Sequence, residues 1–150
     1  MTKLQTATID YPEGKSYTGE VLNDTPHGHG VATGISGFRY EGGFHMGQYH
    51  GLGKIELPDG SSYHGHYSHG QFDGYGKLVD PNGATYEGCF SCGKRQGQGK
   101  LSMADGTTWI AEWVDDKMCG NATLVLPDGK ETKGFFEGAE FIMNKGLENS

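Results

Sequence analysis

One interval governs this sequence: an aromatic residue returns every 23 residues, followed two places later by glycine in the first four units and by Ala111 in the fifth. The opening positions of successive units are Tyr17, Tyr40, Tyr63, Tyr86 and Trp109, and Thr132 opens a unit that is not completed. A Gly-x-Gly pair, first seen at Gly28 and Gly30, keeps the same interval. A fixed interval of this length predicts an array of small stacked units, so it has to be considered before any local motif.

Each unit has the pattern of a β-hairpin. In residues 63–67 (Tyr-His-Gly-His-Tyr), alternation places the rings and the glycine on one face and the histidines on the other. Residues 74–78 (Gly-Tyr-Gly-Lys-Leu) alternate in the same way, and turn sequences such as Pro-Asp-Gly at 58–60 close the hairpins. Interior glycine weakens a strand unless the space is needed, so we predict that rings from neighbouring strands lie over it.

The pattern resembles the MORN repeat family, whose unit begins Tyr-x-Gly and carries a Gly-x-Gly pair, often preceded by His, in its second strand. Residues 27–30 (His-Gly-His-Gly) and 50–53 (His-Gly-Leu-Gly) match that pair. The resemblance covers residues 17–131 as five units, with 1–16 as an N-terminal half-repeat cap and 132–150 as a partial repeat and C-terminal cap or tail. It implies an elongated meander with a scaffolding or adaptor role, sometimes at membranes or the cytoskeleton, and no catalysis by the repeats.

The predicted fold is all-β: an elongated single-layer antiparallel β-meander of stacked hairpins, about 12 strands, twisted and curled into a groove. Only 34% of residues are hydrophobic and 27 are glycine, so the core has to come from stacked aromatic rows. The first repeat has fewer rings, since Val21 takes a ring position, and we expect a shallower core there.

The predicted binding site is the aromatic-lined groove. A single sheet has no second layer to cover this face, so we predict that a helix or extended segment of a protein partner binds there. The residues expected to line it are Tyr40, Phe44, Tyr63, Tyr67, Tyr86, Phe90, Trp109 and Trp113. The chain would then be a non-catalytic scaffold or adaptor.

A second hypothesis uses the outward face. Lys54, Lys77 and Lys100 form a column that Lys94 and Arg95 extend, and such a column could bind acidic phospholipid head groups. Acidic residues on the same face weaken the positive electrostatic field of these lysines. The net charge of −7 argues against nucleic acid as a partner. A third hypothesis is a structural component of a cytoskeletal or ciliary assembly.

We predict no catalytic residue, no cofactor and no metal site. His64 and His66 project to one side, but a metal would need a third and usually a fourth ligand. Cys89 and Cys92 form a lone C-x-x-C at a strand end, and three cysteines fit free thiols in a reducing compartment. No long apolar run or signal pattern is present, so we expect a cytoplasmic protein, with association to the cytoskeleton or to a cilium or flagellum as a further expectation.

The C-terminal edge of the array is rich in large apolar residues, including Trp109, Trp113 and Phe136. Natural proteins rarely expose an unpaired strand with such residues. Two explanations remain open from the sequence: residues 137–143 fold back as a short cap, or the edge is an interface for a homodimer or another partner.

Overall fold

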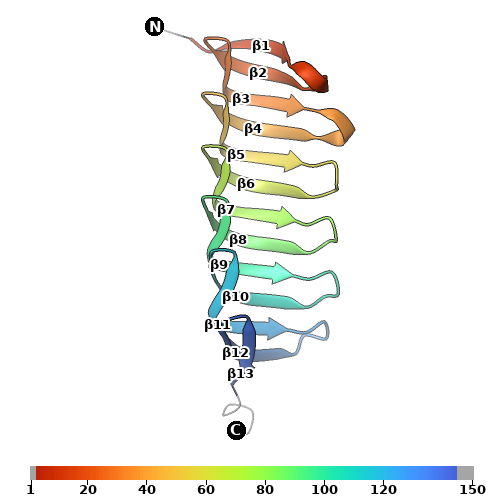
Figure 1. Cartoon of the computed structure of the whole chain (residues 1–150), viewed down its shortest axis with the longest axis vertical. Helices are drawn as coiled ribbons and strands as arrows, with labels where there is room; N and C mark the ends of the chain where they lie inside the picture. Colours follow the sequence, from red (N-terminus) through yellow and green to blue (C-terminus); the bar gives the residue numbers. More distant parts are fainter. Residues whose placement is uncertain (1–2, 145–150) are drawn as a thin grey trace.

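The computed structural model describes residues 3–144, which form one antiparallel sheet in which every strand pairs with its neighbours in the sequence (Figure 1). The thirteen strands are β1 Gln5–Asp10, β2 Ser16–Leu22, β3 Thr25–Thr33, β4 Arg39–His45, β5 Gln48–Glu56, β6 Ser62–Ser68, β7 Gln71–Val79, β8 Thr85–Ser91, β9 Lys94–Ser102, β10 Thr108–Val114, β11 Lys117–Val125, β12 Glu131–Glu137 and β13 Glu140–Met143. Short 3-10 turns, η1 Pro12–Gly14 and η2 Ile35–Gly37, replace simple turns near the N-terminus. The all-β meander is therefore confirmed.

The sheet has one strand more than expected among the described residues. The additional strand is β13, which pairs with β12 through contacts such as Phe136 with Phe141. The chain reverses at Gly138, whose φ of +64° is a left-handed conformation that favours glycine. Residues 137–143 thus fold back on the array, which is the first of the two alternatives that the sequence left open.

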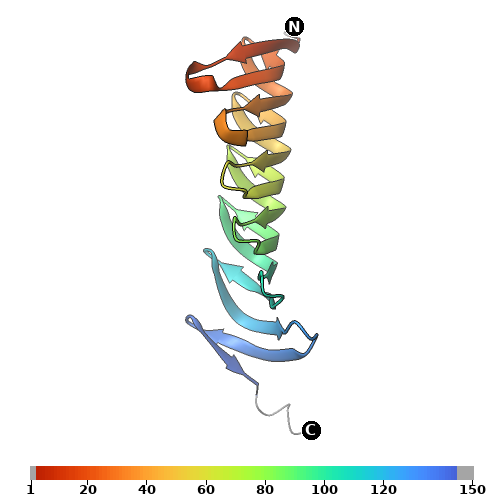
Figure 2. The ribbon, with the colours of Figure 1, turned by 90° about the vertical axis from the view of Figure 1, so that its right-hand side faces the viewer.

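A β-bulge bends each repeat. Between β4 and β5, Gly42 pairs with Gly53 and Phe44 pairs with Tyr49, so the register shifts at the residue between Gly42 and Phe44. The equivalent shifts lie between Gly19 and Val21, Gly65 and Tyr67, Gly88 and Phe90, and Ala111 and Glu112. Bulges increase local twist and bend the strand. Figure 2 shows the result, because the hairpins are bent and do not form a flat ribbon.

The opening tyrosine of each of the first four repeats lies over glycine, as the sequence predicted. A Cβ atom built on Gly76 would lie 2.3 Å from the hydroxyl oxygen of Tyr63, and one built on Gly65 would lie 2.5 Å from the Cα atom of Gly76. Tyr63 itself is fully buried. We call the face that carries these tyrosines the ring face and the opposite one the outer face.

The tyrosine hydroxyl has a second role that sequence reasoning missed. It donates a hydrogen bond to the backbone carbonyl oxygen three residues later, at the bulge, from Tyr40 to Gly43 (2.7 Å), Tyr63 to His66 (2.9 Å) and Tyr86 to Cys89 (2.9 Å). Tyr17 makes the same bond to Glu20. Unpaired polar groups in a core are costly, which explains why the first four repeats open with tyrosine and not phenylalanine.

Candidate functional site on the ring face

A further row of side chains on the ring face covers the opening tyrosines. The ring of Tyr49 stacks on Tyr40 with centroids 3.9 Å apart, and Phe72 stacks on Tyr63 at 3.7 Å. Both come from the second strand of the same hairpin. The row repeats every 23 residues as Pro26, Tyr49, Phe72, Arg95, Met118 and Phe141. This interval was available in the sequence but was not recognised.

The eight residues predicted to line an open groove form most of the core. Tyr40, Phe44, Tyr63, Tyr67, Tyr86, Phe90 and Trp113 are at most 6% exposed, and Trp109 is half-buried. Rings of successive repeats pack edge to face, as Tyr40 does with Tyr67 at 5.4 Å between centroids. Side chains of the chain itself therefore occupy the middle of the ring face, and partner binding by these residues stays a prediction.

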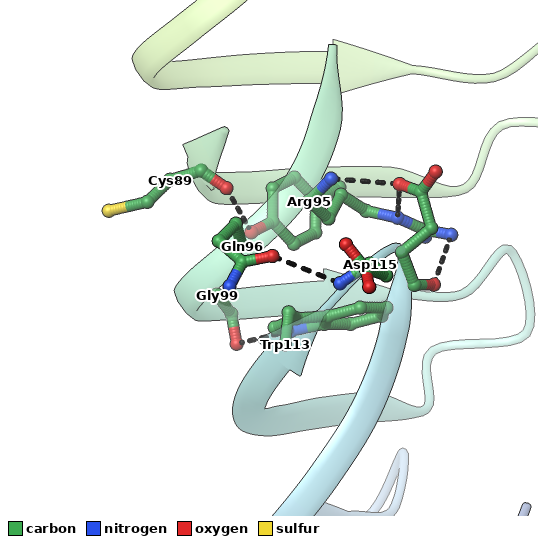
Figure 3. Close-up of polar contacts among 8 residues, drawn as sticks. Cys89, Arg95, Gln96, Gly99, Trp113 and Asp115 are labelled. Atoms are coloured by element: carbon green, nitrogen blue, oxygen red, sulfur yellow. Dashed lines mark hydrogen bonds and ion pairs between the residues drawn. The ribbon is translucent and has the colours of Figure 1, made fainter. Parts of the chain in front are cut away.

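Arg95 lies on the ring face and not at the end of the outward lysine column, where it was expected. Its guanidinium carbon is 4.5 Å from the ring centroid of Trp113, and its Nε is 3.3 Å from Oδ1 of Asp116 (Figure 3). Alternation explains this position, since Arg95 lies two residues before Gly97 and four before Gly99 on β9. A guanidinium prefers such stacking on an aromatic face to full hydration.

Asp116 connects the fourth repeat to the fifth. Its N–H donates to the carbonyl oxygen of Arg95 (3.0 Å), and its carboxylate accepts from the Arg95 backbone N–H (2.8 Å). In earlier repeats a glycine makes the corresponding backbone bond, as Gly70 does to Tyr49 and Gly93 to Phe72. Asp116 has a φ of +70°, so it adopts the conformation of the glycine that it replaces and adds an ionic contact.

An apolar groove remains open on the ring face near the N-terminus. It has a volume of about 470 Å³, and Tyr17, Ala32 and Phe44 are among the residues of its lining. Also in the lining are turn residues Tyr11, Ile35 and Phe38, together with Pro26, Gly47 and Tyr49 at the hairpin tips. Pro26 and Ala32 in this lining are smaller than Tyr49 and Ile55, which hold the same positions one repeat later, in line with the expected shallower core. We call it the N-terminal groove.

A second hollow, of about 690 Å³, lies on the ring face near the C-terminus. Trp113, Met118 and Phe136 share its lining with charged residues that include Lys117. At this end Phe141 of β13 packs against Trp109, with centroids 5.1 Å apart, so the fold-back covers part of the apolar edge. The lining of this hollow, with Arg95, Asp116 and Lys117, is richer in charged residues than that of the N-terminal groove, where Glu13 and Lys15 are the charged ones, so it suits an apolar segment less well.

The 23-residue repeat agrees with a known protein family. The sequence model described as the MORN repeat matches residues 17–39, 40–62, 63–85, 86–108 and 109–131. This chain belongs to the MORN repeat family. Among solved structures it is similar to the TCP domain of SAS-4 (dCPAP) from Drosophila melanogaster, solved with a proline-rich motif of Ana2 (dSTIL), at 16% identity over 90% of each chain and a TM-score of 0.42. No curated protein matches the chain.

The outer face of the MORN repeats carries the predicted lysine column. Lys54 pairs across strands with Glu41 and His64, and Lys77 pairs with His64 and Glu87. Lys100 continues the row beside Glu87. Along β5, the Nζ atom of Lys54 lies 3.4 Å from Oε1 of Glu56. Glu41 and Glu87 therefore lie beside the lysines in this row, and His64 separates Lys54 from Lys77, as in a solvated ladder. Lipid binding by Lys54, Lys77, Lys100 and Lys94 stays a prediction, whereas Arg95, on the ring face, does not extend this column.

The described residues, 3–144, offer little other chemistry. No group there of three or more His, Cys, Asp or Glu side chains could hold a metal ion. Cys89, Cys92 and Cys119 are free thiols. His64 and His66 are exposed on the outer face. The described residues also contain no helix that is long and apolar enough to cross a bilayer.

Proposed function

We propose that this MORN protein is a non-catalytic scaffold that binds a short apolar segment, helical or extended, of a partner protein in the N-terminal groove. The observation that carries the proposal is the exposure of large apolar side chains around the groove, with Ile35 68% and Tyr11 43% exposed. Apolar concavities of this kind are the usual binding sites of proteins that lack an enclosed cavity.

The composition of the groove supports a protein partner. Tyr11, Tyr49 and Phe38 offer aromatic surface, and rigid rings dominate the binding energy of many protein interfaces. Glu13 and Lys15 lie in the same lining and can orient polar groups of a bound segment. The buried tyrosines below would act as a rigid floor, so binding would not require the core to open.

Paired substitutions test this proposal. Ile35→Asp places a charge in the groove, whereas Leu52→Asp changes a side chain of similar exposure, 60%, on the outer face. Peptides selected from a random display library on the wild-type protein should lose at least tenfold in affinity for Ile35→Asp and keep it for Leu52→Asp. Circular dichroism and melting curves check that both variants are folded. Equal retention by both variants, or loss with Leu52→Asp alone, would reject the groove.

Two broader expectations belong to this proposal. We propose a cytoplasmic protein associated with cytoskeletal or ciliary structures, supported by the family resemblance and testable by fluorescence localisation.

Acidic phospholipid remains the alternative ligand. Vesicles of phosphatidylserine should sediment with the protein only if the lysine column binds their head groups. Replacing Lys54, Lys77 and Lys100 by Glu would then abolish sedimentation with vesicles and leave peptide affinity in the groove unchanged.

A further inference from the structure

The free edge of β1 has few of the features that normally protect an edge strand, and Asp10 at its end is its one charged residue. Its sequence, Gln-Thr-Ala-Thr-Ile-Asp at 5–10, contains no proline, lysine or glycine, and its pairing with β2 has no bulge. Within residues 3–144 no strand pairs with its other side. An unprotected edge of this length is a template for pairing with another strand.

The free hydrogen-bonding groups of this edge can be identified. Tyr11 N–H donates to the carbonyl oxygen of Lys15 (2.8 Å), and hydrogen-bonded and non-hydrogen-bonded pairs alternate along an antiparallel ladder. The odd-numbered residues of β1 therefore bond to β2. The N–H and C=O groups of Thr6, Thr8 and Asp10 point away from the sheet, which leaves three donors and three acceptors.

We propose that two copies of this chain associate through β1, antiparallel, with Thr8 facing Thr8 of the second copy at a two-fold axis. In this register Thr6 faces Asp10 of the other copy on both sides of the axis, so all three donors and all three acceptors are paired. A shift of two residues in either direction leaves only two of the three pairs within β1. Within β1, the register centred on Thr8 therefore pairs the most backbone groups.

The side chains of β1 are complementary in the same register. On the ring face, half-buried Ala7 faces half-buried Ile9 of the other copy, and both already pack against the aromatic core. Ile9 pairs only with Tyr17. Ile55, the equivalent residue two repeats later, has a neighbour on both sides, because it lies between Tyr40 and Tyr63. The second copy would cover the side of Ile9 that has no neighbour.

The outer face of the interface is also favourable. Two threonines meet at the axis, and the Thr6 hydroxyl can donate to the Asp10 carboxylate of the other copy. Thr–Thr pairs and polar pairs of this kind stabilise neighbouring strands, and no like charges face each other. The result would be one continuous sheet running through both copies.

The opposite edge of the array is less suited to association. Asn144 N–H donates to the carbonyl oxygen of Lys133 (2.9 Å), so by the same alternation only Phe141 and Met143 of β13 direct backbone groups outward. Acidic Glu140 lies at the start of this four-residue strand. The homodimer that the sequence left open as one alternative at the C-terminal edge is therefore assigned instead to the N-terminal edge.

Light scattering with matched edge variants tests the proposal. The wild-type protein should have twice the chain mass of 16.2 kDa at submillimolar concentration. Thr8→Lys opposes two ammonium groups at the axis, and Thr8→Pro removes an outward donor, so each should reduce the mass twofold. Met143→Lys places the same charge on β13, at a residue whose backbone groups point away from β12, and this variant should remain dimeric. Circular dichroism shows whether each variant is folded.

Amide exchange measured by nuclear magnetic resonance defines the register. The amides of Thr6, Thr8 and Asp10 should be protected in the wild-type protein and exchange at least tenfold faster in Thr8→Lys. A wild-type protein whose mass in solution is that of one chain, 16.2 kDa, would overturn the proposal. So would a dimer that survives both Thr8 variants. The N-terminal groove uses different residues, so Ile35→Asp should lose at least tenfold in peptide affinity and still dimerise, which keeps the two proposals separable.

Discussion

Tyr63 lies so close over Gly76 that a Cβ atom on residue 76 would come within 2.3 Å of the tyrosine hydroxyl oxygen. The φ angle of Gly76 is not positive, so glycine is required there for space and not for backbone conformation. The same contact recurs between Tyr40 and Gly53, at 2.3 Å. The array is therefore held together by rings that lie against bare backbone.

Gly76→Ala should destabilise the fold strongly, because one methyl group would displace a fully buried ring. We expect the free energy of unfolding, measured by urea denaturation, to fall by about 3 kcal/mol. The neighbouring substitution Lys77→Ala removes an exposed outer-face side chain and should change it by less than about 0.5 kcal/mol. Equal effects of the two substitutions would show that the ring does not need the glycine.

Tyr63→Phe should keep the ring packing and lose the hydrogen bond to the His66 carbonyl oxygen. Leaving that part-buried acceptor unpaired should cost about 1 kcal/mol of stability, measured by thermal or urea unfolding. Tyr75→Phe is the matched control, because Tyr75 is 59% exposed on the outer face and should be neutral. A neutral Tyr63→Phe variant would mean that water replaces the hydroxyl at the bulge.

Alkaline pH should unfold the protein over a defined window. Burial raises the pKa of Tyr63 to about 12, and burial with help from Cys89 raises the pKa of Tyr86 to about 12, from the ordinary 10.0. The unfolded chain then loses protons at lower pH than the folded chain, so stability is complete below pH 10 and is lost as pH rises toward 12. Tyrosinate absorbance and circular dichroism should change together. Ionisation of these tyrosines near pH 10 in a folded protein would contradict the prediction.

Arg95 and Asp116 should show energetic coupling between the fourth and fifth repeats. We expect a double-mutant cycle with Arg95→Met and Asp116→Asn to give a coupling energy of about 0.5–1 kcal/mol, since both side chains are partly exposed. The coupling should decrease in 1 M salt, where screening shortens the Debye length to about 3 Å. A coupling energy near zero at low salt would mean that the stacking of Arg95 on Trp113 carries the contact alone.

Much of this fold follows from local spacing. The 23-residue interval, the alternation within Tyr63–Tyr67 and the pairing of ring with glycine were all predicted, because they depend on residues adjacent in sequence or one strand apart. The position of Arg95 was also within reach, since it shares the alternation of Gly97 and Gly99. It was misplaced because the residues before the Gly-x-Gly pair were not included in the strand.

The degree of curling determines which surface remains free, and only the tertiary structure shows it. Tyr49 pairs with Phe44, so in a flat sheet it would lie four residues, about 13 Å, from Tyr40 along the strand direction. The bulge bends the hairpin and brings the two rings to 3.9 Å. The sequence alone determined that both rings share one face. Bending at the bulge decided that the ring of Tyr49 covers the ring of Tyr40. The alternation of residues along a strand shows which face a side chain lies on, but it contains no information on how far the hairpin bends.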